Sequence, residues 1–190
     1  MGTAYDWPRT LMARGADPLR AEHLRRRPQE ACSGALHCFL LDCSASMAAG
    51  GKLARAKGVL LALMDEAYQR REHVALLCFG GDAVELRVPP RRAGAWNDAW
   101  LAPIMGGGGT PLNLGVQQAA ALLAKHNSAQ RWLWLLTDGR STESPARPAG
   151  IDAISVLDFE PPRQALRRAE ALAARWQARY VPAGEGTVVG

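Results

Sequence analysis

The fold of this chain is decided by one stretch, Leu36-His37-Cys38-Phe39-Leu40-Leu41-Asp42-Cys43-Ser44-Ala45-Ser46. Its first six residues are almost all apolar, as in a strand buried on both faces of a parallel sheet. The apolar run ends at an acid, Asp42, and two hydroxyls follow at alternate positions. Ligands of open α/β sheets bind just beyond the carboxyl ends of the strands, and oxygen ligands suit a hard cation such as Mg²⁺. We therefore predict a strand followed by a loop that binds a divalent cation.

The composition is that of an ordinary globular protein. The chain has 190 residues, of which 48% are hydrophobic and 22% charged, and this length suffices for one domain with a sizeable core. Its formal net charge of +5 comes from scattered arginines, without the aromatic interleaving of a single-strand groove and without a zinc-finger pattern. We therefore expect no nucleic-acid partner.

Targeting and membrane signals are missing from the sequence pattern. No apolar run reaches the roughly 18 residues that span a bilayer, and the N-terminus has no basic region followed by an apolar one. The four cysteines form no Cys-x-x-Cys pair, and three of them fall in or beside predicted buried strands. Free thiols in a reducing compartment are expected, so we predict a cytoplasmic protein without membrane insertion.

Apolar strand patterns alternate with amphipathic helix patterns along the rest of the chain. Further strands are predicted over 73–79, 83–88, 130–137, 151–157 and 178–182, and helices over 52–70, 111–125 and 162–177. Period-two alternation makes 83–88 an edge strand, which Pro89-Pro90 should close. Trp132 and Trp134 are expected in the core, facing opposite ways. The order of elements predicts a doubly wound, Rossmann-like three-layer α/β sandwich with a mostly parallel central sheet and one antiparallel edge strand.

The two ends of the chain differ from this pattern. Residues 1–34 are polar, arginine-rich and weakly periodic, so a basic N-terminal arm is expected, with a turn or two of helix over 19–24. Residues 35–184 form the predicted domain. Residues 185–190 are predicted to be a flexible tail.

Two further stretches place polar residues at the same edge of the predicted sheet. The first is Gly106-Gly107-Gly108-Gly109-Thr110-Pro111, where Thr110 is the expected helix N-cap and Pro111 the first helical residue. The second is Thr137-Asp138-Gly139, which ends another apolar run. The candidate metal ligands are thus two carboxylates and three hydroxyls: Asp42, Ser44, Ser46, Thr110 and Asp138. Two carboxylates would balance Mg²⁺ and leave a nearly neutral centre that still attracts one more carboxylate.

These three motifs resemble the metal-ion-dependent adhesion site (MIDAS) of von Willebrand factor A domains. The resemblance covers about 35–184, and within the family it is strongest to the C-terminal domain of the magnesium chelatase D subunit and to relatives beside cobalt chelatases. It implies that Ser44, Ser46 and Thr110 coordinate the metal directly. Asp42 and Asp138 would act through a metal-bound water or by hydrogen bonding to the residues that coordinate the metal. A partner Asp or Glu would complete the coordination of the metal. The D subunits carry an AAA+ module and an acidic linker ahead of this domain, and neither pattern occurs in this sequence.

The resemblance implies an interaction subunit without catalytic activity of its own. We expect it to work with a separate AAA+ ATPase, and with a large chelatase subunit as a further partner, in a magnesium or cobalt chelatase-like complex of tetrapyrrole and cobalamin biosynthesis. One alternative is a co-chaperone of a MoxR-type AAA+ ATPase that matures another metalloenzyme. Another is a phosphatase that uses Asp42 and Asp138 with Mg²⁺.

Simpler interpretations also stay open at this point. Ser44 and Ser46 could cap the following helix, with Asp138 in an ordinary turn. ATP hydrolysis by this chain is not expected, because Gly50-Gly51-Lys52-Leu53 has Leu53 where a phosphate loop needs Ser or Thr, and the upstream glycine is missing.

Overall fold

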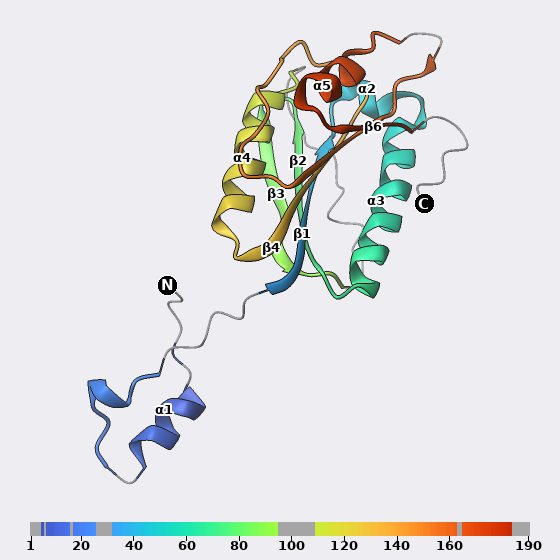
Figure 1. The fold of residues 1–190 in the computed structure, drawn as a ribbon. Coiled ribbons are helices and arrows are strands. Elements are labelled where there is room, and N and C mark those ends of the chain that lie inside the picture. Colours follow the sequence, from blue (N-terminus) through green and yellow to red (C-terminus); the bar gives the residue numbers. More distant parts are fainter. Residues whose placement is uncertain are drawn as a thin grey trace. The chain divides into compact units, whose positions relative to one another are not determined.

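A computed structural model gives the fold (Figure 1) and describes residues 5, 7–15, 17–25, 32–94, 109–162 and 165–183. The chain divides into two compact units, Met1–Cys32 and Ser33–Gly190. No helix among the described residues is long and apolar enough to cross a membrane. The predicted tail, 185–190, lies outside the described residues.

The larger unit is built on one six-stranded sheet. Its strands are β1 (Cys32–Asp42), β2 (His73–Gly80), β3 (Ala83–Arg92), β4 (Ser128–Thr137), β5 (Ala153–Asp158) and β6 (Arg179–Pro182). Their order across the sheet is β3-β2-β1-β4-β5-β6. β2 is parallel to β1, and β5 is parallel to both β4 and β6, whereas β3 pairs antiparallel with β2 at the edge. The predicted mostly parallel sheet with one antiparallel edge strand is confirmed.

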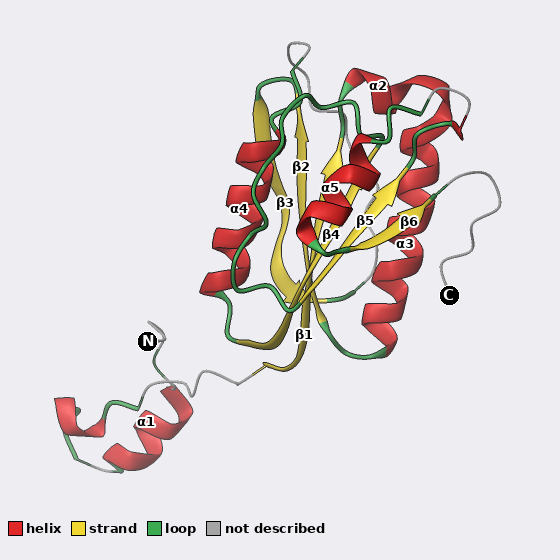
Figure 2. Ribbon diagram, turned by 45° about the horizontal axis from the view of Figure 1, so that its top comes forward, coloured by secondary structure: helices red, strands yellow, loops and turns green. Residues whose placement is uncertain are grey.

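Helices cover both faces of this sheet (Figure 2). One face carries α2 (Ala45–Ala48), a 3₁₀ turn (Ala49–Gly51) and α3 (Lys52–Gln69), and the other carries α4 (Leu112–Lys125) and α5 (Arg168–Trp176). On the α3 side, Leu60 belongs to the same buried cluster as Phe39 and Trp134. On the other side, Leu123 and Trp176 pack in a cluster with Leu40. This is the predicted three-layer sandwich, because each helix buries one apolar stripe on the sheet.

The two tryptophans of β4 correct one expectation. Trp132 and Trp134 both pack on the α3 side, with ring centroids 6.2 Å apart. Residues two apart in a strand share a face. The prediction that they face opposite ways was therefore wrong.

The edge strand β3 is longer than predicted. It runs through Pro89 and Pro90 to Arg92 instead of ending at them. The register shifts at this point, since Val88 pairs with Leu76 and Arg91 with Val74. Two prolines thus lie opposite one residue of β2, as in a β-bulge, and an edge strand tolerates their missing N–H groups.

Helix α5 begins later than the predicted residue 162. Residues 163 and 164 lie outside the described part of the chain, and Arg167, just before the helix, has φ of 54°. A left-handed residue cannot continue a right-handed helix, so α5 begins at Arg168.

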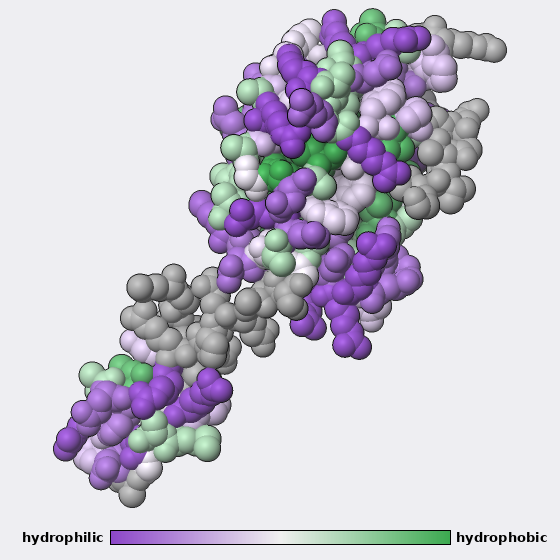
Figure 3. Space-filling model, in the orientation of Figure 1, coloured by the Kyte–Doolittle hydropathy of each residue, from purple (hydrophilic) through white to green (hydrophobic). Residues whose placement is uncertain are grey.

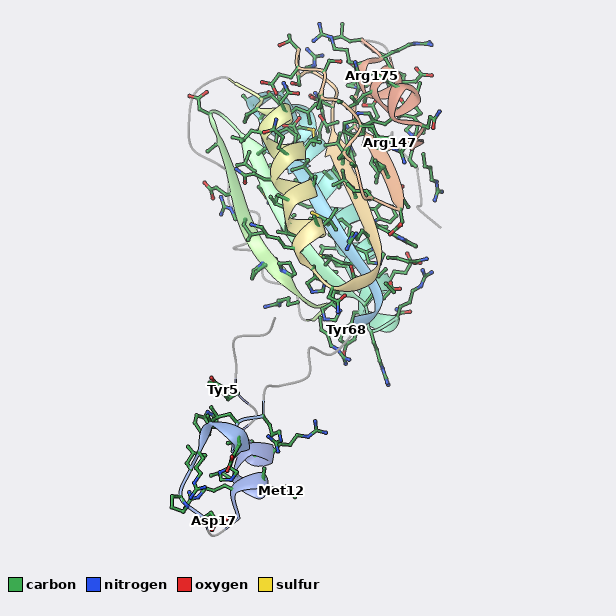
Figure 4. The ribbon with its side chains drawn as sticks, turned by 60° about the vertical axis from the view of Figure 1, so that its left-hand side comes forward. Tyr5, Met12, Asp17, Tyr68, Arg147 and Arg175 are labelled. Atoms are coloured by element: carbon green, nitrogen blue, oxygen red, sulfur yellow. The ribbon has the colours of Figure 1, made fainter. Side chains whose placement is uncertain are left out.

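The smaller unit has its own local structure. It contains α1 (Trp7–Arg14), which was not predicted, and a 3₁₀ turn (Ala21–His23) within the predicted helical stretch 19–24. Thr10 is fully buried, and its hydroxyl accepts a hydrogen bond from the Arg25 amide at 2.9 Å. Met12, labelled in Figure 4, is 83% exposed.

Candidate metal centre

The polar loops meet where the winding of the sheet reverses. β1 and β4 are neighbours in the sheet, and the chain builds β2 and β3 outward on one side and β5 and β6 on the other. Asp42 is the last residue of β1, and Asp138 directly follows β4. Both carboxylates are fully buried. A reversal of strand order is the usual ligand-binding crevice of an open α/β sheet.

Hydrogen bonds join four of the five predicted ligands. The hydroxyls of Ser44 and Ser46 lie 3.1 Å apart, and the Ser46 hydroxyl donates to Asp138 Oδ1 at 3.1 Å. The Ser44 amide donates to Asp42 Oδ1 at 2.9 Å. The oxygens of residues far apart in the sequence therefore form one cluster.

Ser44 does not cap α2 with its hydroxyl. It occupies the N-cap position, but its side chain makes no capping hydrogen bond. Its hydroxyl instead faces that of Ser46. The interpretation of Ser44 as a helix cap is therefore not supported, and the hydroxyl is available to a ligand.

Thr110 does not cap α4 either, which corrects the predicted N-cap. Pro111 occupies the N-cap position and α4 begins at Leu112. The carboxylate of Glu143, from a loop distant in sequence, accepts a hydrogen bond from the Asn113 amide at 2.6 Å. The hydroxyl of Thr110 makes no hydrogen bond to another described residue, while its carbonyl accepts one from the Ser141 hydroxyl at 3.1 Å. The cap thus comes from Glu143, and the Thr110 hydroxyl is not used by the helix.

The glycine run before Thr110 is described only in part. Glycines 106–108 lie outside the described residues. At Gly109 a Cβ atom would come within 2.7 Å of the Gly81 carbonyl oxygen. Only glycine permits this approach between the two loops.

The surroundings of the Asp42 carboxylate disfavour its ionised form. Burial raises its pKa above the ordinary value, and the neighbouring Asp138 carboxylate raises it further. Hydrogen bonds from Ser44 and from the Thr137 hydroxyl, 2.7 Å from Oδ2, act in the opposite direction. The two buried carboxylates therefore repel each other, and a divalent cation bound by both loops would relieve the repulsion.

A residue that the sequence analysis did not assign to the site completes its electrostatics. The ammonium Nζ of Lys52 lies 2.6 Å from Asp138 Oδ2, and both side chains are buried. The signal was present in the sequence, because Lys52, Ala56 and Leu60 follow one another at four-residue steps on the buried face of α3. A lysine on an apolar stripe is almost never fully buried unless paired.

Lys52 changes the charge balance predicted for the centre. With Asp42 and Asp138 ionised and Lys52 charged, the three groups carry a net charge of minus one. Mg²⁺ would bring the total to plus one, which is not the nearly neutral value expected from the carboxylates alone. Arg140, whose Nε lies 3.9 Å from Asp138 Oδ2, adds further positive charge at the more exposed side. A centre that held Mg²⁺ would therefore attract a further carboxylate.

The donor set fits a hard divalent cation. All the candidate ligands offer hydroxyl or carboxylate oxygen, and among the described residues no group of three or more His, Cys, Asp or Glu side chains could hold a metal ion. Few carboxylates with several hydroxyls suit Mg²⁺, which keeps some of its waters. Zinc prefers nitrogen and sulfur ligands.

Comparison with known proteins identifies the family. The model of the von Willebrand factor type A domain matches residues 38–140. The chain belongs to the von Willebrand factor type A (VWA) family. Its match begins in β1 and ends just after Asp138, so it spans both acid-bearing strand ends of the centre.

Chelatase subunits and another bacterial protein are among the relatives of this VWA domain. It is 43% identical over 104 residues to the magnesium-chelatase 60 kDa subunit of Cereibacter sphaeroides, covering 54% of this chain and 18% of that subunit. It is 37% identical over 137 residues to the uncharacterized protein Rv2850c of Mycobacterium tuberculosis, covering 69% of this chain and 22% of the relative. The chain thus spans about a fifth of the length of these relatives.

A solved VWA domain has the same fold. The SpRpn10 VWA domain superposes with a TM-score of 0.58 at 14% identity, covering 82% of this chain and 99% of that domain. At this identity the likeness bears on the fold alone. It supports the sandwich described above.

Proposed function

We propose that this VWA domain is a metal-dependent interaction module of a chelatase-like assembly and that it binds a carboxylate of a partner protein through Mg²⁺. The observation that carries the proposal is the clustering of Ser44, Ser46 and Asp138 oxygens beside the buried Lys52 ammonium. A cation bound there would leave the centre positively charged. An anionic partner group would balance that charge.

In this proposal each residue of the centre has a separate task. Ser44, Ser46 and Thr110 would hold the metal through their hydroxyls, and Asp42 and Asp138 would act through water or from one layer further out. Asp42 also fixes the loop after β1, since it accepts hydrogen bonds from the Ser44 amide and the Thr137 hydroxyl. Bound Mg²⁺ would supply a positive charge and a coordination position open to the partner.

The hydrogen bonds favour docking over catalysis. Both oxygens of Asp42 already accept hydrogen bonds, and Asp138 is held by Ser46 and Lys52. Both carboxylates are fully buried. A phosphatase that used either one as a nucleophile would need it exposed to substrate. We therefore propose a subunit without catalytic activity of its own.

The relatives suggest the partners. Several are named as magnesium-chelatase subunits, and this supports an assembly with other chelatase subunits. We propose an AAA+ ATPase subunit as the partner that supplies the Asp or Glu, and a large chelatase subunit as a second partner. The assembly would insert magnesium or cobalt into a tetrapyrrole, as in cobalamin biosynthesis, in the cytoplasm.

The test is co-purification with purified AAA+ proteins from the same genome, one of the chelatase type and one of the MoxR type. Each is passed over the immobilised full chain in Mg²⁺ or in EDTA. We expect the chelatase-type ATPase to be retained in Mg²⁺ and lost in EDTA.

Two variants make this test specific for the metal centre. Ser46→Ala should lose retention, and the control Ser128→Ala, at the opposite end of β4, should keep it. Retention of the MoxR-type ATPase alone would instead assign the domain to maturation of another metalloenzyme. Retention that is unaffected by EDTA, or no retention, would contradict the proposal.

A further inference from the structure

A cavity of about 250 Å³ lies beside the candidate metal centre. It is formed between the start of α4, the loop that follows β4, and α5. Leu112, Ala169 and Leu172 give it an apolar floor, and all three are buried members of one core cluster. Arg168 and Arg175 stand on its α5 side (Arg175 is labelled in Figure 4). The cavity therefore combines an apolar interior with a basic wall.

The cavity and the metal centre share a wall. Thr137 and Gly139 both line the cavity, and they flank Asp138 in the sequence. Thr137 also donates its hydroxyl to Asp42. A partner segment that reached the metal would therefore pass next to the cavity.

Hydrogen bonds fix the loop that walls the cavity. The Ser141 hydroxyl donates to the Thr110 carbonyl at 3.1 Å and accepts from the Glu143 amide at 3.2 Å. The Trp176 indole donates to the Pro145 carbonyl at 3.0 Å. A site held this firmly loses little conformational entropy when it binds a ligand.

Among the described residues, the two arginines at the cavity have no carboxylate partner. Arg168 donates hydrogen bonds to the carbonyls of Arg140 and Ser141, each at 3.3 Å. Arg175 forms no hydrogen bond or ion pair with another described residue. Glu143 is the one acid among the described residues that line the cavity, and its carboxylate accepts a hydrogen bond from the Asn113 amide. Hydrophilic side chains also lie over α5 on the face shown in Figure 3. The wall is therefore complementary to an acidic ligand.

We propose that this cavity is a docking subsite for an acidic segment of the partner protein, which inserts one apolar side chain onto Leu112 and Leu172. Carboxylates beside that side chain pair with Arg168 and Arg175. In an extended segment, residues two apart are about 6.6 Å apart on one face, so one short segment can place an acid at the metal and an apolar side chain in the cavity. The inference rests on the proposed function, because the same segment supplies the metal-binding carboxylate.

Three blocked pentapeptides test the inference by calorimetry with the full chain in Mg²⁺. The first has a leucine flanked by acidic residues, the second has glycine in place of the leucine, and the third has amides in place of the acids. We expect the glycine peptide to bind several-fold more weakly than the first peptide. The amide peptide should not bind measurably.

The variants Arg175→Glu and Lys57→Glu distinguish the effect of charge at the cavity from the effect of the protein's net charge, because both variants change the net charge equally. Lys57 lies on α3, on the other face of the sheet. Arg175→Glu should weaken binding of the first peptide at least tenfold without changing the affinity for Mg²⁺. Lys57→Glu should change neither affinity. Equal binding of the leucine and glycine peptides, or equal losses in the two variants, would overturn the inference.

A separate titration with Mg²⁺ alone distinguishes the two proposals. If the chain does not bind Mg²⁺ but Arg175→Glu still weakens binding of the first peptide, the docking subsite is supported and the metal centre is contradicted. If the chain binds Mg²⁺ but Arg175→Glu does not weaken binding of the first peptide, the metal centre is supported and the docking subsite is contradicted.

Discussion

Lys52 and Asp138 form a buried ion pair in which the ammonium lies 2.6 Å from the carboxylate. The pair joins the first residue of α3 to the residue that follows β4. Asp138 also accepts hydrogen bonds from the Ser46 hydroxyl and the Arg140 amide. A cation that enters the centre must therefore share Asp138 with an ammonium that is already there.

Replacing Lys52 with methionine should have opposite effects on the metal-free and metal-bound protein. Without magnesium, Lys52→Met removes the nearer countercharge of the buried Asp138 carboxylate and leaves only the partly exposed Arg140 guanidinium, whose Nε lies 3.9 Å from Oδ2. Breaking a buried pair in this way costs about 3–5 kcal/mol of unfolding free energy. With magnesium, loss of the competing positive charge should tighten metal binding at least about tenfold. Urea unfolding in EDTA and in Mg²⁺ measures both effects.

The control for this variant is Lys57→Met on the same helix, which should change neither quantity. Lys52→Met with wild-type stability in EDTA would show that the ion pair does not support the fold. An unchanged affinity for Mg²⁺ would show that Lys52 does not compete with the metal.

Thr110→Ala should leave the fold intact and remove the thermal stabilisation by Mg²⁺. The Thr110 hydroxyl makes no hydrogen bond to another described residue, so its loss leaves no buried group unpaired. Thr110→Ser keeps the hydroxyl and should keep the Mg²⁺ response. Thermal melts across a Mg²⁺ series test this, and an unchanged response in Thr110→Ala would remove Thr110 from the ligand set.

Asp42→Ala should also remove the Mg²⁺ response, but with a cost to the fold. Its carboxylate accepts hydrogen bonds from the Ser44 amide and the Thr137 hydroxyl, and both donors would be left unpaired. Each unpaired buried donor costs about 1–3 kcal/mol. Chemical unfolding in EDTA should show the loss, and a full Mg²⁺-induced rise in melting temperature in this variant would count against the centre.

The buried Asp158 predicts how stability depends on pH. Burial raises its pKa, while hydrogen bonds from the Glu160 amide and the Tyr180 hydroxyl partly oppose the rise. The folded state then holds this proton to higher pH than the unfolded chain, whose carboxyl titrates near about 3.9. The unfolding free energy should therefore fall as pH rises from about 4 through the folded-state pKa.

Asp158→Asn should make this pH dependence shallower, with the remaining slope coming in part from Asp42, whose pKa is raised as well. Asp65→Asn, at an exposed position on α3, makes the same chemical change away from this site and is the matched control. Unfolding free energies measured from pH 4 to pH 8 decide the matter, and equal slopes in Asp158→Asn and wild type would refute the prediction.

Cys38 should resist thiol reagents while the protein is folded. Burial raises the pKa of its thiol to about 12, so almost no reactive thiolate is present at pH 8. N-ethylmaleimide labelling followed by peptide mass mapping should show Cys38 unmodified in buffer and modified in guanidinium chloride. Rapid labelling of Cys38 in buffer would contradict its burial.

Much of the fold could be predicted because its signals are local. A run such as 36–41 is apolar at nearly every position, and the stripe on 52–70 repeats at helical spacing. The error on Trp132 and Trp134 was a misapplied local rule, since residues two apart in a strand share a face. Other errors arose where distant residues decide local structure. Glu143 caps α4 from a position 30 residues further along the chain, and the pairing of β3 with β2 carries the strand through its prolines.

The candidate centre shows the same division between local and distant signals. Its acids and hydroxyls could be found because they follow apolar runs or stand in short motifs. The Thr137–Asp42 hydrogen bond joins residues 95 positions apart, and no local pattern indicates it. Lys52 could have been found, since its position on the buried face of α3 is visible in the sequence.

The hydrogen bond from the Ser141 hydroxyl to the Thr110 carbonyl connects the loop that lines the cavity to a proposed metal ligand. Thr110 would hold the ion, and Ser141 lines the cavity proposed for the partner's side chain. If binding at both sites favours the same position of this hydrogen bond, each ligand must strengthen the other by the same factor. The ion would then act as an allosteric effector of the cavity, and an acidic peptide would raise the affinity for Mg²⁺ even before its carboxylate is counted as a ligand.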